Sequence, residues 1–166
     1  MKNKYSDEFL KAIPKTDLHL HLDGSLRLST LIELAQKYNI ALPAYDEAGL
    51  KKTVFKDRYE SLPDYLKGFG YTVAVLQTAE ALERVAYELA WDNINEGVYY
   101  FEVRFAPQLH IHDKLSFEDI MLAVNSGLAR AQKEHNNSAA VKNGELPHFH
   151  YGIINCALRF FLPVFS

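Results

Sequence analysis

Three pairs of histidines, each with one residue between its members, are the features of this sequence best suited to metal chemistry. They are His19/His21, His110/His112 and His148/His150. In a β-strand, residues i and i+2 project to the same side about 7 Å apart, so two imidazoles can converge on one ion. Neutral imidazole is a good zinc ligand, with a Zn–N bond of about 2.0–2.1 Å. The spacing alone is weak evidence, because it occurs three times.

The residues around the first pair distinguish it from the other two. His19 and His21 lie between Asp17 and Asp23, and a glycine and a serine then follow, where a strand would give way to a loop. Ligating histidines usually donate their second ring nitrogen to an acceptor, which nearby carboxylates can supply. For this pair we favour a metal site, with an ordinary structural role as the alternative.

The other reactive side chains have simpler interpretations. His110 and His112 follow a proline and are expected to be surface-loop histidines, while His148 and His150 are expected at the beginning of a strand without a metal. Cys156 has no paired histidine or oxyanion arrangement near it in the sequence, so we expect a buried small hydrophobic residue rather than a nucleophile.

Three segments have the pattern of β-strands. Residues 15–22 alternate strictly, which places the polar residues 17, 19 and 21 on one face and Leu18, Leu20 and Leu22 on the other. Residues 98–105 form a β-branched and aromatic run, and residues 148–156 are expected to form the third strand. Strands separated by long helical connections predict parallel βα units with helices covering the sheet.

Helical periodicity predicts the connections between these strands. A helix is expected to follow Ser25, others over 61–76 and 79–95, and one from 117 to about 134. Thr78 is a plausible N-cap, and Ser116 with Asp119 resembles a capping box. Residues 43–57 and 135–148 are expected to be loops. The first connection is long enough that it must hold more than one helix.

Composition limits the class of protein. The chain has 166 residues, a net charge of −3 and one cysteine, which excludes a disulfide framework and favours a reducing compartment. No signal-peptide core is recognisable, and no run approaches the roughly 20 apolar residues that span a bilayer. The mild acidity argues against nucleic acid as a partner. We therefore expect a cytoplasmic protein with no nucleic-acid or membrane partner.

Four blocks of sequence resemble the adenosine deaminase family, whose members are zinc-dependent (β/α)8-barrel hydrolases. The block PKTDLHLHLDGS at 14–25 is similar to the family's first barrel strand and is the most specific. SLPDYLKGF at 61–69 resembles its helical lid, EGVYYFEVRFAP at 96–107 its second strand, and IINCALR at 153–159 its third. The resemblance implies an α/β fold of TIM-barrel type, of which about the first three strands and their helices are present.

The resemblance also implies roles for individual residues. His19 and His21 would be metal ligands for one Zn²⁺ per complete active site, and His21 and Asp23 would contact the substrate, with Asp23 hydrogen-bonded to the ribose. An apolar wall above the base would consist of Leu62, Tyr65, Leu66 and Phe69, for which a plain helix core is the equal alternative.

Two further residues are expected on the barrel's interior. Glu102 and Arg104 share a face of the second strand, where they are expected to form a structural polar layer rather than to react. The family's remaining zinc ligands and its catalytic glutamate and histidine belong to strands five to eight. We therefore expect residues 1–166 to be the N-terminal portion of one barrel domain that contains no catalytic residue, since such barrels need about 250 residues.

The implied reaction is zinc-dependent hydrolytic deamination of adenosine or deoxyadenosine to the inosine nucleoside and ammonia, although we expect this chain alone to be inactive. A purine nucleoside is the implied partner. Two alternatives stay open. One is a related amino-purine amidohydrolase of the adenine deaminase kind, which Asp23 as a ribose partner disfavours. The other is a non-catalytic polypeptide that associates through its open sheet.

Overall fold

The protein is an α/β structure built on a three-stranded parallel sheet, described over residues 4–158 in a computed structural model. The strands are β1 (Lys15–His21), β2 (Val98–Phe105) and β3 (His150–Asn155), in the order β1-β2-β3. The helices are α1 (Asp7–Ala12), α2 (Leu28–Tyr38), α3 (Glu47–Thr53), α4 (Leu62–Val75), α5 (Ala79–Asn95), α6 (Phe117–Asn136) and α7 (Ala139–Lys142), with a 3₁₀ turn η1 (Pro107–Leu109). The three predicted strands and their parallel arrangement are confirmed.

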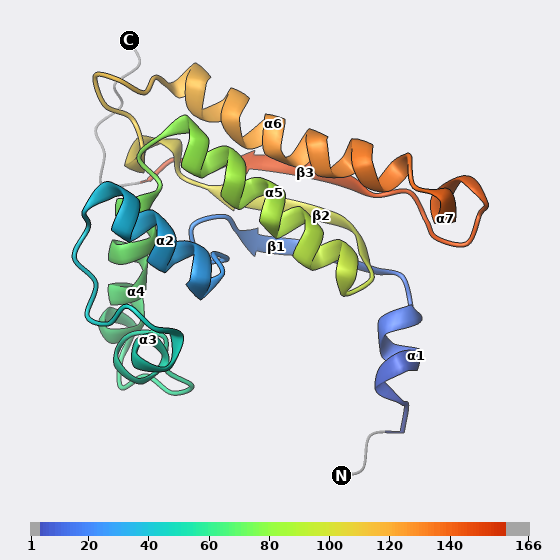
Figure 1. Ribbon diagram of the computed structural model, residues 1–166, viewed down its shortest axis with the longest axis horizontal. Helices are drawn as coiled ribbons and strands as arrows, with labels where there is room; N and C mark the ends of the chain where they lie inside the picture. The colour runs from blue at the N-terminus through green and yellow to red at the C-terminus, as the bar shows by residue number, and fades with distance from the viewer. Residues whose placement is uncertain (1–3, 159–166) are drawn as a thin grey trace.

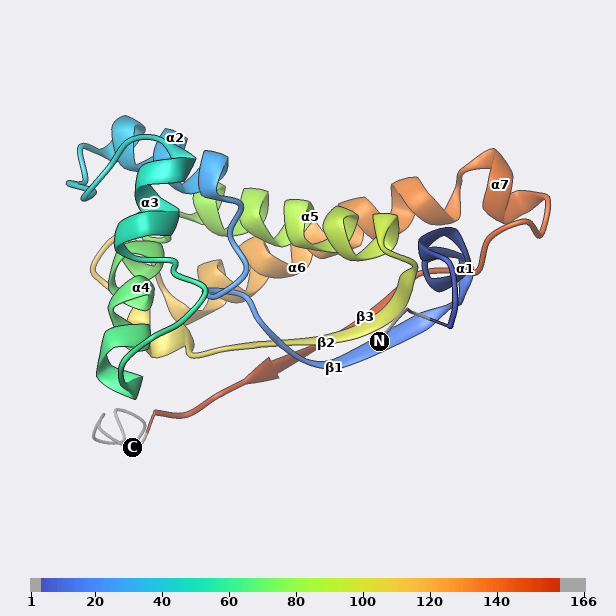
Figure 2. The same cartoon turned by 90° about the horizontal axis from the view of Figure 1, so that it is seen from below.

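The helices α5 and α6 lie side by side along the same face of the sheet (Figures 1 and 2). The connection from β1 to β2 contains α2 to α5, so the expectation of more than one helix there is confirmed. Among the described residues, no helix combines the length and the apolar character needed to cross a membrane.

Local capping signals fix where the long helices begin. The side chains of Ser61 and Thr78 accept hydrogen bonds from the backbone at the starts of α4 and α5. The predicted capping box at the start of α6 is present, with Ser116 and Asp119 bonded reciprocally. Gly97, just beyond α5, has a φ of +80°, a left-handed conformation that glycine adopts without strain.

Two segments expected to be loops contain short helices. Helix α3 lies within residues 43–57, where Asp46 accepts a hydrogen bond from the Gly49 amide and Leu50 is fully buried. Helix α7 lies within residues 135–148 and is capped by Ser138. Each helix is too short for its periodicity to be read from sequence. Arg159, the last residue of the block at 153–159, lies outside the described residues.

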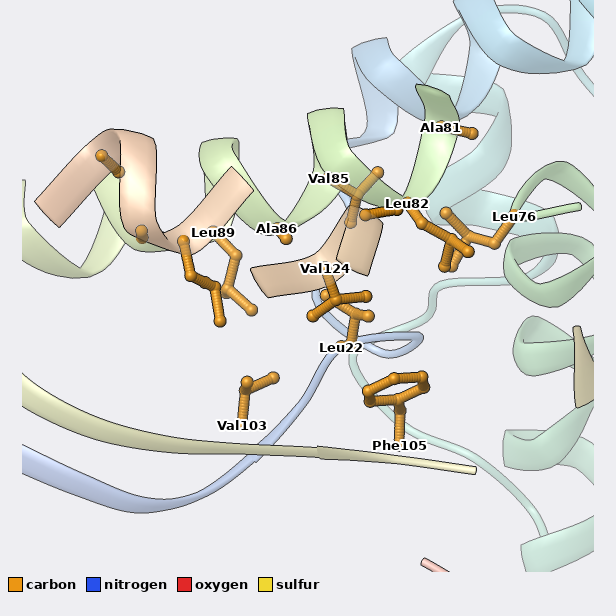
Figure 3. Close-up of a cluster of buried hydrophobic side chains, with 14 of the residues drawn as sticks. Leu22, Leu76, Ala81, Leu82, Val85, Ala86, Leu89, Val103, Phe105 and Val124 are labelled. Carbon is orange, nitrogen blue, oxygen red and sulfur yellow. The ribbon is translucent and has the colours of Figure 1, made fainter. Parts of the chain in front are cut away.

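A continuous apolar core fills the space between the helices and the sheet. Figure 3 shows side chains of α5 and α6 facing side chains of β2 and the end of β1, namely Leu82, Val85, Leu89, Val124, Val103, Phe105 and Leu22. All seven are less than a tenth exposed. Full burial of each such aliphatic or aromatic side chain stabilises the fold by about 1.5–3 kcal/mol, so the sheet and the helix pair form one unit.

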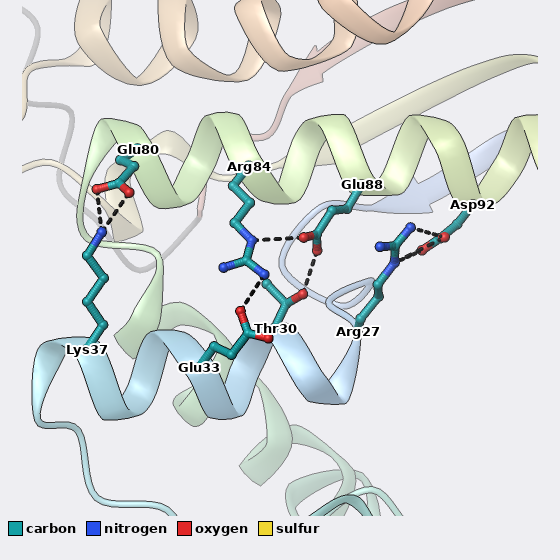
Figure 4. Close-up of polar contacts among 8 residues, drawn as sticks. All are labelled: Arg27, Thr30, Glu33, Lys37, Glu80, Arg84, Glu88 and Asp92. Carbon is teal, nitrogen blue, oxygen red and sulfur yellow. Dashed lines mark hydrogen bonds and ion pairs between the residues drawn. The ribbon is translucent and has the colours of Figure 1, made fainter.

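Polar contacts join α2 to the outer side of α5 (Figure 4). Lys37 pairs with Glu80 at 2.6 Å, and Arg84 pairs with Glu33 at 2.6 Å. Glu88 accepts hydrogen bonds from Arg84 and from the buried Thr30. These contacts hold α2, and with it the loop that leaves β1, against the helix layer.

Strand β1 carries a β-bulge that interrupts the strict alternation predicted for residues 15–22. Between the pairs Asp17–Phe101 and Leu20–Val103, β1 has two residues and β2 has one. Leu18 is therefore 55% exposed, whereas Leu20 is partly buried against the core. Asp17 pairs with the fully buried Phe101, on the side of the sheet that the helices cover. The prediction that Leu18 shares a face with Leu20 and Leu22, and Asp17 a face with the histidines, is wrong because the extra residue shifts the alternation.

Candidate metal and substrate site

His19 and His21 lie at the C-terminal end of β1 with their rings facing each other. Their Nε2 atoms are 3.3 Å apart, and their ring centroids are 5.3 Å apart at an interplanar angle of 33°. Both side chains are exposed. Two nitrogens bound to one tetrahedral zinc, with Zn–N bonds of about 2.0–2.1 Å, are about 3.3–3.4 Å apart. The pair therefore has the separation that two ligands of one ion require.

Asp23 follows the histidines and turns its side chain into the protein. It is 6% exposed, and its Oδ1 lies 3.8 Å from Nδ1 of His21. Burial raises the pKa of Asp23, while the neighbouring His21 and two backbone amides act in the opposite direction. Within residues 4–158, Oδ1 has no hydrogen-bond partner. A buried carboxyl oxygen without a partner is unfavourable, so this atom is available to a ligand that donates a hydrogen bond.

A cavity of about 210 Å³ lies beside Asp23. Half of the residues that line it are aromatic, and the lining is Asp23, Gly24, Phe55, Tyr59, Tyr65, Gly68, Phe69 and Thr72. Phe69 makes edge-to-face contacts with His21 at 6.4 Å and with Tyr65 at 5.7 Å between centroids. The aromatic wall is thus continuous with the histidine pair.

The four residues expected to form the apolar wall divide into two groups. Tyr65 and Phe69 line the cavity, whereas Leu62 and Leu66 do not and are 66% and 48% exposed. Because Leu62 and Leu66 are exposed, the alternative of a plain helix core is wrong for these two residues. Phe55 and Tyr59 could not be found from the sequence, since neither belongs to a periodic segment.

The other two histidine pairs do not form comparable sites. His110 is fully buried, with Nδ1 2.9 Å from the Leu76 carbonyl oxygen, so the prediction of a surface-loop histidine is wrong for it. His112 is exposed, as predicted. His148 and His150 are exposed at the beginning of β3, and their ring centroids are 6.4 Å apart.

Burial explains the different chemistry of His110. Its side chain packs beside Phe105 in the core, and this desolvation lowers the pKa of His110. A neutral imidazole is thereby favoured. Cys156, expected to be buried, is half-buried.

The interior face of β2 is polar, as predicted. Tyr100, Glu102 and Arg104 are half-buried and alternate with core residues that face the helices. The Tyr100 hydroxyl donates to Glu102 Oε1 at 3.0 Å. In the described part of the chain, no cluster of three histidine, cysteine, aspartate or glutamate side chains is close enough to hold a metal ion. The histidine pair is therefore an incomplete ligand set within residues 4–158.

A sequence profile of adenosine deaminase matches residues 14–143, the segment that contains the histidine pair, Asp23 and α4. The chain belongs to the adenosine deaminase family. Among curated relatives, the probable adenosine deaminase of Dictyostelium discoideum is 47% identical over 126 residues, and the adenosine deaminase of Vibrio atlanticus is 42% identical over 125. Each alignment covers 75% of this chain but only 16% and 38% of those two proteins. The chain therefore spans less than two fifths of the length of either relative.

Solved structures of other deaminases and amidohydrolases have a similar fold. The N6-methyl-AMP deaminase from Arabidopsis thaliana is 29% identical and gives a TM-score of 0.60 over 75% of this chain and 35% of its own. A Burkholderia ambifaria amidohydrolase solved with bound Zn gives a TM-score of 0.69 over 93% of this chain and 39% of its own, at 18% identity. The second likeness concerns the fold alone. The expected fold class, the first three strands of a TIM-type barrel with their helices, is confirmed.

Proposed function

We propose that this chain is the N-terminal part of a zinc-dependent hydrolase that deaminates a purine nucleoside, adenosine or deoxyadenosine. His19 and His21 supply two ligands of one zinc ion, and the remaining ligands and the catalytic residues come from barrel strands beyond β3. In this proposal residues 1–166 form part of a single barrel domain and do not catalyse the reaction alone.

The observation that carries the proposal is the 3.3 Å separation of the two Nε2 atoms. It matches the spacing of about 3.3–3.4 Å expected for two imidazoles on a tetrahedral zinc. The pair lies at the C-terminal end of a barrel strand, which is where active sites of this fold are built. A catalytic zinc site needs about three protein ligands, so a pair alone is expected to hold the ion weakly.

At the proposed site, the zinc ion and the side chains of the protein have separate roles in the deamination. When bound, zinc supplies a water whose pKa is lowered to about 7, so that hydroxide is available near neutral pH. His19 and His21 orient the ion, and Asp23 accepts a hydrogen bond from a sugar hydroxyl through its free Oδ1. Phe69 and Tyr65 provide an apolar surface that the purine ring can contact.

The cavity favours a nucleoside over a nucleotide. Among the described residues that line it there is no lysine or arginine to pair with a phosphate, and the one carboxyl group is that of Asp23. Related Arabidopsis structures were solved with GMP and IMP, so nucleotides are substrates to test in parallel. Its volume of about 210 Å³ is below the roughly 300–1,000 Å³ of typical ligand pockets, so it accommodates only part of a nucleoside.

Adenine is the competing substrate, and it has a relative in the structural comparisons. An Arthrobacter aurescens adenine deaminase has the same fold, with a TM-score of 0.59 and 22% identity. Adenine has no ribose hydroxyl to donate to Asp23, and the buried Oδ1 would stay without a partner. We therefore favour the nucleoside.

Ammonia release tests the proposal directly. The chain would be joined to the part of Vibrio atlanticus adenosine deaminase that follows the matched segment, and adenosine, adenine and AMP would be compared. We expect adenosine to be the best substrate, and we expect Asp23→Ala to reduce kcat/KM for adenosine about 10- to 100-fold with little effect on adenine. A folded, zinc-loaded fusion that prefers adenine, or that releases no ammonia, would contradict it.

A further inference from the structure

The bulge in β1 leaves Leu18 and His19 without pairing partners on β2, so the peptide group between them lies outside the regular ladder. This group consists of the Leu18 carbonyl and the His19 amide, and it immediately precedes the His19 side chain. A bulge leaves the extra residue unpaired in the ladder. Groups other than the β2 backbone must therefore form hydrogen bonds with this carbonyl and this amide. The orientation of the peptide plane fixes the direction in which the His19 imidazole points.

Both ends of the peptide are held by side chains. Arg104 on β2 donates from Nη2 to the Leu18 carbonyl oxygen at 2.8 Å. Asp17 accepts through Oδ1 from the His19 backbone N–H at 2.9 Å. One charged residue thus holds the carbonyl and another holds the amide of a single peptide plane, and hydrogen bonds with a charged partner are the stronger kind.

The two side chains reach this peptide from opposite sides of the sheet. Asp17 pairs with the buried Phe101, while Arg104 pairs with His21 and belongs to the interior polar layer. Within residues 4–158, the Nε of Arg104 has no hydrogen-bond partner, while its Nη2 bonds the Leu18 carbonyl oxygen. The contact with Leu18 is therefore the one that fixes its guanidinium in the described structure.

We infer that Arg104 and Asp17 are positioning residues that lock the Leu18–His19 peptide and thereby hold His19 at metal-sharing distance from His21. The inference rests on the proposed metal function of the two histidines. Metal–ligand distances are held to within about 0.2 Å, and the imidazole nitrogen lies several bonds from the backbone. Loss of either hydrogen bond would allow the peptide plane to rotate. Even a small rotation would then separate the two Nε2 atoms beyond that tolerance.

The test uses Cu²⁺–iminodiacetate, a chelate with positions left for two imidazoles, on the 166-residue chain. Its affinity is measured by titration, and the number of coordinated imidazole nitrogens by electron paramagnetic resonance. We expect the unmodified chain to bind through two imidazoles, and His19→Ala to bind through one. We expect Arg104→Met and Asp17→Ala to weaken binding about 10- to 100-fold, the usual cost of losing a residue that orients a metal ligand, and to shift the spectrum toward one imidazole.

Two controls separate positioning from general stability. Asp17→Asn keeps an acceptor oxygen and is expected to retain the affinity and two-imidazole spectrum of the unmodified chain. Leu128→Ala removes core volume from α6, far from β1 in the sequence and outside the site, and is expected to lower the melting temperature without changing binding below it.

The outcomes distinguish the inference from the proposed function. If the unmodified chain binds no more tightly than His19→Ala, the metal pair itself is refuted. If the pair binds through two imidazoles but Arg104→Met and Asp17→Ala behave like the unmodified chain, only the positioning role is refuted. Equal weakening of chelate binding by Leu128→Ala would also refute the positioning role, because the loss of affinity would then result from lower stability of the fold.

Discussion

Two imidazole nitrogens 3.3 Å apart share either a proton or a metal ion. A shared proton gives one hydrogen bond between two exposed side chains, which contributes only about 0.5–1.5 kcal/mol. We favour the metal ion, because the pair lies at the carboxyl end of a barrel strand. It also lies beside the buried carboxyl group of Asp23, whose Oδ1 has no hydrogen-bond partner among the described residues. At the scale of residues, this combination separates His19 and His21 from the other histidine pairs.

The buried His110 is expected to make the stability of the protein depend on pH. Because burial lowers its pKa in the folded state, the unfolded chain binds the proton more tightly. The stabilising effect of the neutral ring is complete above the unfolded pKa of about 6.5 and is lost as the pH falls below it. Urea unfolding of the unmodified chain should therefore show a free energy of unfolding that declines between pH 7.5 and pH 5.

Two variants isolate this contribution. His110→Asn should be less stable at pH 7.5 and should show a shallower decline, since the titrating ring is gone. His148→Gln alters an exposed histidine and should leave the slope unchanged. An unaltered slope in His110→Asn would show that other groups produce the pH dependence.

The histidine pair could be predicted from the sequence because its spacing and its neighbours are local. The burial of His110 could not be predicted, because it depends on contacts with Phe105 and with the Leu76 carbonyl, and Leu76 is distant in the sequence. The cavity residues Phe55 and Tyr59 were missed for the same reason. The sequence thus predicted the close approach of the two rings, which lie two positions apart on one strand, whereas their role as metal ligands stays a prediction.

At the scale of elements, the close approach of α5 and α6 depends on Gly127. A Cβ at this position would collide with the Glu83 carbonyl oxygen and would lie 2.9 Å from the Tyr87 amide and 3.1 Å from the Ala86 Cβ. Backbone atoms of a packed helix cannot move aside without displacing the core. The glycine therefore sets the distance between the two helices that cover the sheet.

Gly127→Ala is expected to destabilise the fold by about 1–3 kcal/mol, the usual cost of overpacking, despite the better helix propensity of alanine. Gly70→Ala is the matched control, because a Cβ at that helical position meets nothing within 4 Å. It should stabilise the protein by about 0.5–1 kcal/mol. Chemical denaturation measures both, and a neutral Gly127→Ala would show that the helices can separate freely.

The long helices and all three strands could be predicted, because their signals are periodic and their caps lie within a few residues of their ends. The short helices α3 and α7 could not, since one or two turns are too few to show a period. The bulge in β1 was also missed. The alternation of polar and apolar residues in the sequence is the same whether or not a strand contains a bulge. Only the pairing of β1 with β2 shows the change of register.

At the scale of the whole molecule, the described sheet has three strands, and β1 and β3 each pair on one side only. Figure 2 shows the helices α5 and α6 on one side of it. The family assignment gives these features a simple explanation, because the chain spans less than two fifths of the length of its curated relatives, at 16% and 38%. Under the proposed function, the sheet would be the first part of a barrel whose later strands would supply the other zinc ligands. The cytoplasmic location inferred from composition stays a prediction.

The zinc content of a complete barrel tests the central claim most directly. The chain joined to the later part of Vibrio atlanticus adenosine deaminase would be dialysed against zinc-free buffer and analysed for metal, with His19→Ala and His21→Ala alongside. We expect about one zinc ion per fusion protein and a loss of most of it in both variants, with the fold retained by circular dichroism. Undiminished zinc in either folded variant would contradict the assignment of that histidine as a ligand, and with it the account of the site.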